Sequence, residues 1–364
     1  MKATRAPRLR IISAIASKDI LDAIRNKTTL SIIIGTVTLM ASSLVLPWLG
    51  SFDRTPVALA HDPSSSTLVR AMTTREEFRL RLVSSHDDLV EAIAGAPELR
   101  LGLVIPEGLT VATGEDSAVE IEGLAPHWAR PEPLQELVTY FEQQLSEASW
   151  QEVHIALAAP VYPAPEHIGQ HSMAANTIVI ATLTLGLALV PGLLVEEKET
   201  HTLESLLVTP ARLAEVALGK AAVGVVYGAI AAGLAVGLNA KWFVHWDLAA
   251  LGVGLGIAFT VAVGILLGLL IDSSSTTNVW MGLVLLLLLL PAFLGSVMGS
   301  GPDGFVQTIV EWIPTSAVSR LLALAMSDPV DFSDWWLDAT RLAVSTCLLV
   351  PLVARQLRRF EDQR

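Results

Sequence analysis

Long apolar stretches separated by short polar segments make up most of the chain. The first stretch, residues 28–50, carries no charged side chain and is long enough to cross about 30 Å of hydrocarbon as a helix. The last, 337–357, is weaker because Asp338 and Arg341 lie at its start. The four others lie near 172–195, 216–238, 248–271 and 276–298. This pattern predicts six transmembrane helices.

The first stretch has a second interpretation, as the hydrophobic region of a cleaved signal peptide. The small residues Ala58-Leu59-Ala60 would then form the cleavage motif. Residues 28–50 are long for such a region and lie some distance before that motif, which favours an uncleaved membrane anchor.

Two segments outside the apolar stretches have patterns of their own. In residues 1–27, isoleucines and leucines recur among charged residues at helical spacing, which predicts an interfacial helix along the inner leaflet. In residues 51–171, Ser85 precedes Asp88 by three positions and predicts the start of a short helix, and a longer amphipathic helix follows Leu134. Alternating or continuous apolar runs predict strands at 79–83, 101–105, 120–122 and 153–157.

The predicted fold is therefore an all-α polytopic membrane protein with six transmembrane helices and an inserted extracytoplasmic α/β domain. Its expected parts are the interfacial helix 1–27, the first transmembrane helix 28–50, the extracytoplasmic domain 51–171, transmembrane helices two to six within 172–357, and the cytoplasmic tail 358–364.

Composition and charge agree with this division. Hydrophobic residues make up 52% of the chain and charged residues 16%, which is unusual for a single soluble globule. The segment 51–171 holds 19 acidic and 7 basic residues, and this imbalance equals the whole net charge of -12. Such an acidic domain does not favour nucleic acid as a partner.

The placement of lysine and arginine predicts the orientation. These residues gather before residue 28, between the second and third stretches, and at the C-terminal end. The short segments expected on the opposite side hold only Lys241, Arg320 and, at a helix edge, Arg341. By the positive-inside rule, both termini are expected to be cytoplasmic.

Several kinds of chemistry find no support in the sequence. The GxxxxGK[ST] phosphate-binding loop does not occur, and Cys347 is the only cysteine. His167 and His171 have a spacing that suits an external metal site, but solvated surface histidines explain them as well. No nucleophile, base and orienting group can be recognised. We therefore expect no enzyme, and no cofactor bound by this chain.

The absence of charged residues from the span cores and the spacing of glycines indicate where energy enters and how the helices pack. The span cores lack the ionisable groups with which ion-coupled carriers bind their coupling ion, so energy is expected to enter from outside the membrane. Glycines recur four residues apart, which predicts close helix packing, within the chain or at a dimer seam, rather than a ligand site. The packing glycines are Gly224, Gly228, Gly252, Gly256, Gly264 and Gly268, and Gly233 and Gly237 have the same spacing.

The loop between the second and third spans, 196–215, has the most informative pattern of polar residues. It combines an acidic cluster with an apolar stripe and a Thr-Pro helix start. Because its polar face is acidic, a protein partner is favoured over the membrane surface. The candidate contact residues are Glu196, Glu197, Glu199, Thr202, Leu203, Glu204, Leu206, Leu207, Thr209 and Pro210.

Three segments together resemble the permease subunits of type-2 ATP-binding-cassette (ABC) exporters. They are the start IASKDILDAIRNKTTL, the loop EEKETHTLESLLVTPARLAEVALGK and the large insert, which contains LVIPEG. More narrowly, they resemble the sodium- and drug-exporting branch, which has an extracytoplasmic domain at this position. The resemblance covers nearly the whole chain, and the loop is its most specific part.

The resemblance implies partners and a location. A separate ABC ATPase that binds ATP-Mg would contact the start helix and the loop. A second permease, either an identical copy or a paired paralogue, would complete the pathway in the plasma membrane of a prokaryote. The family also implies an external re-entrant segment, 303–327, formed by Gly304–Trp312 and Thr315–Met326. The substrate does not follow from the resemblance.

The main alternative is a membrane receptor or assembly scaffold whose external domain binds a ligand without transport. It is disfavoured because about seven residues follow the last predicted span, whereas a receptor usually needs a cytoplasmic output domain. The sequence therefore predicts a transporter subunit surrounded by membrane lipid.

Overall fold

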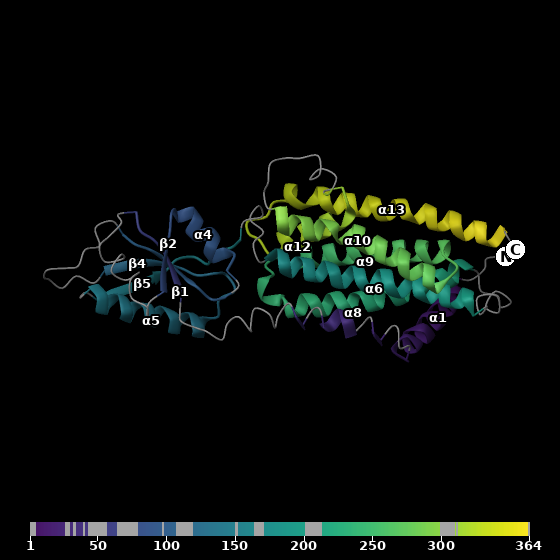
Figure 1. Ribbon diagram of the computed structural model, residues 1–364, viewed down its shortest axis with the longest axis horizontal. Helices are drawn as coiled ribbons and strands as arrows, with labels where there is room; N and C mark the ends of the chain where they lie inside the picture. Colours follow the sequence, from purple (N-terminus) through teal and green to yellow (C-terminus); the bar gives the residue numbers. More distant parts are fainter. Residues whose placement is uncertain are drawn as a thin grey trace. The chain divides into compact units, whose positions relative to one another are not determined.

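The computed structural model places the chain in two compact units (Figure 1). One unit comprises Met1–Leu44, Ser172–Ala325 and Asp331–Arg364, and the other comprises Val45–His171 and Met326–Val330. The structure describes residues 5–25, 30–31, 34–38, 41–42, 57–63, 79–96, 98–106, 119–149, 152–163, 171–200, 213–298, 310 and 312–362.

The first unit is a bundle of helices. Its elements are α1 (Arg5–Arg25), α6 (His171–Glu199), α8 (Leu213–Leu238), the 3-10 turn η1 (Ala240–Trp242), α9 (Trp246–Leu270), α10 (Ser274–Met298), α12 (Pro314–Ala325) and α13 (Phe332–Asp362). Helix α9 lies in the middle of the unit, against α8, α10, α12 and α13, and the shorter α12 lies along its N-terminal half (Figure 1).

Among the described residues, five helices of this bundle are long and apolar enough to cross a membrane. They are Ala174–Glu199, Leu213–Leu238, Trp246–Leu270, Ser274–Pro291 and Phe332–Arg359, which correspond to the second to sixth spans expected from the sequence. Large apolar side chains stay exposed on their outer faces, among them Leu286 of α10 (65%) and Leu348 of α13 (63%), as expected for contact with lipid tails. Most of the expected first span, 28–50, lies outside the described residues.

Several helix boundaries differ from the sequence expectation, including the end of α13 at Asp362, which lies inside the expected tail 358–364. Helix α6 continues through Glu199, so the acidic cluster that we placed in a loop forms the last turn of a helix. Helix α13 begins at Phe332, five residues before the expected span, because its first residues include Asp334 and so lie outside the apolar stretch that located the span. Within the expected re-entrant segment 303–327, α12 provides one well-packed helix, and the part before Trp312 lies almost entirely outside the described residues.

Glycines determine how closely the helices approach. A Cβ on Gly224 would lie 2.4 Å from Val190 Cγ2 of α6 and 3.0 Å from Val261 Cγ2 of α9. The five other glycines assigned to packing also lie against neighbouring helices of the same chain: Gly228, Gly252, Gly256, Gly264 and Gly268. In contrast, an added Cβ on Gly233 or Gly237 would meet nothing within 4 Å among the described residues.

The second unit contains a five-stranded sheet. Its strands are β1 (Val57–His61), β2 (Arg79–Val83), β3 (Leu101–Val104), β4 (Val119–Leu124) and β5 (Val153–Leu157). Their order is β2-β1-β3-β4-β5, and all neighbours are parallel except β3 and β4. Helix α4 (His86–Ala94) packs on one face through Leu89 and Ile93. Helix α5 (Pro131–Ser149) packs on the other through Phe141 and Leu145.

Strand β1 was missed in the sequence, where its residues were considered only as a cleavage motif. Ala58, Leu59 and Ala60 are all buried because helices cover both faces of the sheet, so the strand has no polar alternation to detect. It is an inner strand bonded to β2 and β3. Cleavage after Ala60 would cut this strand, which argues against the signal-peptide alternative.

We predict that Gly224→Ala destabilises the bundle, whereas Gly233→Ala does not. Both changes give the helix the same gain in intrinsic propensity, but only the Gly224 methyl group is forced against Val190 and Val261. Overpacking of this kind costs about 1–3 kcal/mol. Thermal unfolding of the full chain in detergent should show a lower midpoint for Gly224→Ala alone, and equal midpoints would contradict the packing.

Candidate functional site

The last turn of α6 connects four other helices, and we call Glu197, Lys198 and Glu199 the α6 junction. The helix ends directly after them: Thr200 donates both its N–H and its hydroxyl to the carbonyl of Glu196, over 3.0 and 2.7 Å. Each residue of the junction binds a different neighbour.

Glu197 binds a buried lysine. Lys220 of α8 has a side chain only 2% exposed, and its ammonium lies 2.6 Å from Glu197 Oε1 and 2.7 Å from Asp19 Oδ2 of α1. Both carboxylates are themselves largely buried. An isolated ammonium in such surroundings is strongly disfavoured, so it must be paired. The triad therefore holds α1, α6 and α8 together.

Two further contacts fix α1 in place beside the triad. The Tyr227 hydroxyl of α8 donates to the Ile20 carbonyl of α1 over 2.8 Å. Closer to the triad, Gly219 lets α1 approach so closely that an added Cβ would lie 2.7 Å from Ile15 Cγ2. The amphipathic helix expected in residues 1–27 is thus docked on the bundle by packing, hydrogen bonding and charge.

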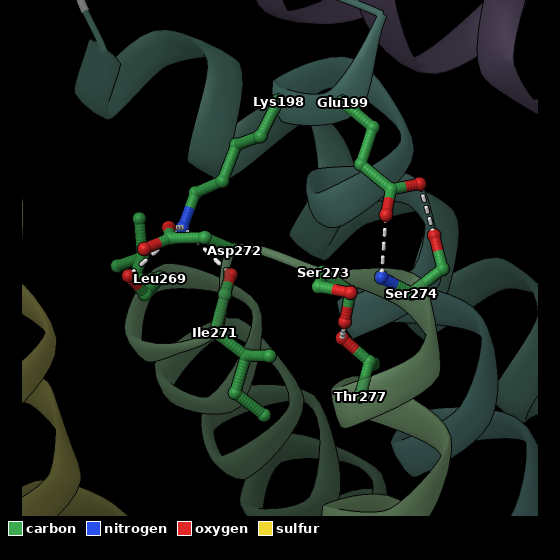
Figure 2. Close-up of polar contacts among 8 residues, drawn as sticks. All are labelled: Lys198, Glu199, Leu269, Ile271, Asp272, Ser273, Ser274 and Thr277. Carbon is green, nitrogen blue, oxygen red and sulfur yellow. Dashed lines mark hydrogen bonds and ion pairs between the residues drawn. The ribbon is translucent and has the colours of Figure 1, made fainter.

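Lys198 closes the C-terminal end of α9 (Figure 2). Its ammonium donates to the carbonyls of Leu269 and Ile271 over 3.0 and 2.9 Å, and it lies 3.0 Å from Asp272 Oδ1. The last carbonyls of a helix have no partners within the helix and carry partial negative charge. A lysine that is 8% exposed is therefore well matched to this position.

Glu199 closes the N-terminal end of α10 (Figure 2). Its carboxylate accepts the backbone N–H of Ser274 over 2.7 Å and also the Ser274 hydroxyl. The first N–H groups of a helix lack partners within the helix and favour a negative charge. At the same helix start, the Ser273 carbonyl accepts both the N–H and the hydroxyl of Thr277, over 2.9 and 2.8 Å.

Consecutive residues of α6 thus hold both sides of the short α9–α10 turn, with a cation at the helix end and an anion at the helix start. Together with the Lys220 triad, the α6 junction contacts α1, α8, α9 and α10. The arrangement resembles a mechanical connection more than a reaction centre, because its charges are used in pairing and capping.

The structure places only some of the candidate contact residues. Glu196 is an exposed residue on α6, and Glu197 and Glu199 belong to the α6 junction. We expected these carboxylates to meet basic groups of a partner, but two of them bind groups of their own chain. The others lie outside the described residues: Thr202, Leu203, Glu204, Leu206, Leu207, Thr209 and Pro210.

Sequence reasoning missed Asp19, Lys198, Lys220 and Ser274 as members of this site. Lys220 gave a usable signal, because a lysine five residues inside a predicted span needs a buried counter-ion. We assigned it instead to the polar loop. Of the two histidines weighed as metal ligands, His171 begins α6 and His167 lies outside the described residues. Among the described residues, no group of three potential metal ligands comes together.

The five candidate spanning helices in the described part of the chain indicate a multi-pass membrane protein. A family model described as ABC-2 family transporter protein matches residues 27–354, so this chain belongs to the ABC-2 family of transporters. Members of this family are membrane components of transporters and work in general with an ABC ATPase. Comparison with curated proteins gives no match.

We predict that Lys220→Met costs about 3–5 kcal/mol of stability, because two buried carboxylates lose their cation. Adding Asp19→Asn and Glu197→Gln should restore most of this loss, since the triple variant buries no unpaired charge. Unfolding of the full chain by SDS in mixed micelles measures the difference. A Lys220→Met variant as stable as the original chain would show that the triad does not hold these helices.

Proposed function

We propose that the chain is the permease subunit of an ABC exporter, driven by a separate ATPase that docks on the segment between α6 and α8. The observation that carries this proposal is the α6 junction. The loop that follows it is attached, within one helical turn, to α1, α8, α9 and α10. A displacement of this loop would therefore act on most of the bundle at once.

The proposed topology has six spans, with both termini and the α6 junction in the cytoplasm. Contacts within the bundle support this arrangement. Leu357 near the end of α13 packs against Leu213 and Val216 at the start of α8, so the basic end of α13 lies with Lys198 and Lys220. Clustering of lysine and arginine at one end of the bundle fits the positive-inside rule.

The segment 51–171 would then be extracytoplasmic, as in the sodium- and drug-exporting branch. Its last residue, His171, begins α6, and α6 runs from there to the α6 junction at its other end. Its sheet is covered by helices on both faces, which supports an independently folded domain. Family membership favours transport over a receptor or scaffold role, and a second permease, identical or paralogous, would complete the pathway.

The ATPase contact is proposed to use Leu203, Leu206 and Leu207 as the buried stripe and Glu196 and Glu204 as charges at its edge. Movement would then pass along α6, through Lys198 to α9 and through Glu199 to α10. Docking and transmission are separate steps in this scheme, so two sets of variants can distinguish them.

For docking, we predict that a Leu203→Ala, Leu206→Ala double variant loses its ATPase. Truncation of each leucine would weaken ATPase binding by about 1.5–3 kcal/mol, because its apolar side chain would no longer be buried in the contact. The measurement is ATPase activity that co-purifies with the chain from gently solubilised membranes. Leu283→Ala with Leu286→Ala is a matched control, because these leucines are exposed on α10. Full ATPase retention by the loop variant would exclude the loop as the docking site.

For transmission, we predict that a Lys198→Met, Glu199→Gln double variant retains the ATPase, but that movement of α6 no longer reaches the α9–α10 turn. The readout is the labelling rate of a single cysteine at Thr276, with Cys347→Ser, in the purified complex. ATP should change this rate in the otherwise unmodified chain and leave it unchanged in the junction variant. The same response to ATP in both would contradict transmission through the α6 junction.

A further inference from the structure

A second charged cluster lies at the opposite end of the bundle from the α6 junction. Asp338 of α13 has a side chain 3% exposed, and two arginines share it. Arg320 Nε of α12 lies 3.2 Å from Asp338 Oδ2, and Arg341 Nη1 of α13 lies 3.5 Å from Asp338 Oδ1. The cluster therefore carries one positive charge in excess.

This excess is unusual for its place in the chain. Between residues 221 and 354 the sequence contains three basic residues, Lys241, Arg320 and Arg341, and two of them converge on one carboxylate. A single guanidinium would neutralise Asp338. The second guanidinium therefore has no carboxylate of its own among the described residues.

The arginines are also accessible from the outer face of the bundle. Leu337, Arg341, Val344 and Leu348 follow one another along one side of α13 at spacings of three or four residues, and the three apolar members are 43–63% exposed. Side chains of a helix lean toward its N-terminus. Arg341 therefore extends from the lipid-facing stripe toward the start of α13.

The start of α13 has the features of a membrane interface. Phe332 and Trp336 are 67% and 43% exposed there, and Trp312 is 70% exposed, as in the aromatic belts found at headgroup depth. The Arg341 guanidinium lies over the Trp312 ring, 5.4 Å from its centroid. The guanidinium is thus held at the level where lipid phosphates are found.

We infer that Arg320 and Arg341 bind the phosphate of a membrane phospholipid in the leaflet at this end of the bundle. Guanidinium groups match phosphate oxygens in geometry and charge, and Asp338 fixes both arginines in position while leaving a net positive charge for the ligand. A free phosphate offers the same headgroup chemistry. The lipid is favoured because the exposed stripe of Val344 and Leu348, directly below Arg341, gives an acyl chain an apolar surface.

The test is a titration of the purified full chain with phosphatidylglycerol, followed by native mass spectrometry. The variant combines Arg320→Gln, Arg341→Gln and Asp338→Asn, which removes the site without leaving a buried unpaired charge. We expect it to bind the first phospholipid about tenfold or more weakly, because charge-assisted hydrogen bonds from two guanidiniums are lost. Lys241→Gln removes one charge at the same end of the bundle and is expected to bind as the original chain does.

Two results would overturn the inference. One is equal phosphatidylglycerol binding by the triple variant and the original chain. The other is displacement of the bound lipid by millimolar inorganic phosphate, which would identify a site for a soluble anion. Retention of lipid by the original chain in the presence of phosphate, together with its loss from the triple variant, supports the lipid site. None of these results depends on the ATPase, so they leave the proposed coupling untouched.

Discussion

The ammonium group of Lys220 imposes the constraint on which the rest of the helical unit depends. With 2% of its side chain exposed, it must be paired, and the two carboxylates that lie 2.6 and 2.7 Å from it come from helices far apart in sequence. Supplying Asp19 requires α1 to lie against α8, and supplying Glu197 brings the last turn of α6 to the same point. Once that turn is fixed, Lys198 and Glu199 face the ends of α9 and α10. One buried cation thus organises five helices around the end of α6.

The two ends of the bundle pair their buried charges in opposite proportions. At the α6 junction two carboxylates share one lysine, whereas near the start of α13 two arginines share Asp338. The first cluster lies inside the protein and is used to hold helices together. The second is open toward the outer face of α13, and its surplus positive charge suits it to a ligand.

Much of the fold followed from local pattern. Hydropathy located the second to sixth spans, alternation located β2, β4 and β5, and a continuous apolar run located β3. Ser85 predicted the start of α4, where its hydroxyl accepts the N–H of Asp88. Strand β1 was missed because burial on both faces leaves no period to recognise. The site was harder, since Glu199 and Ser274 are 75 residues apart and no local pattern joins a helix end to the cap that closes it.

The central claim is that the last turn of α6 moves together with the α9–α10 turn when ATP acts on the complex. Spin labels at Thr200 and Thr276 report this directly by pulsed electron resonance in the assembled transporter. The account predicts the same narrow distance distribution with and without ATP, because Lys198 and Glu199 keep both helix ends attached. A distance that lengthens or broadens on ATP binding would contradict it, since the loop would then move without carrying α9 and α10.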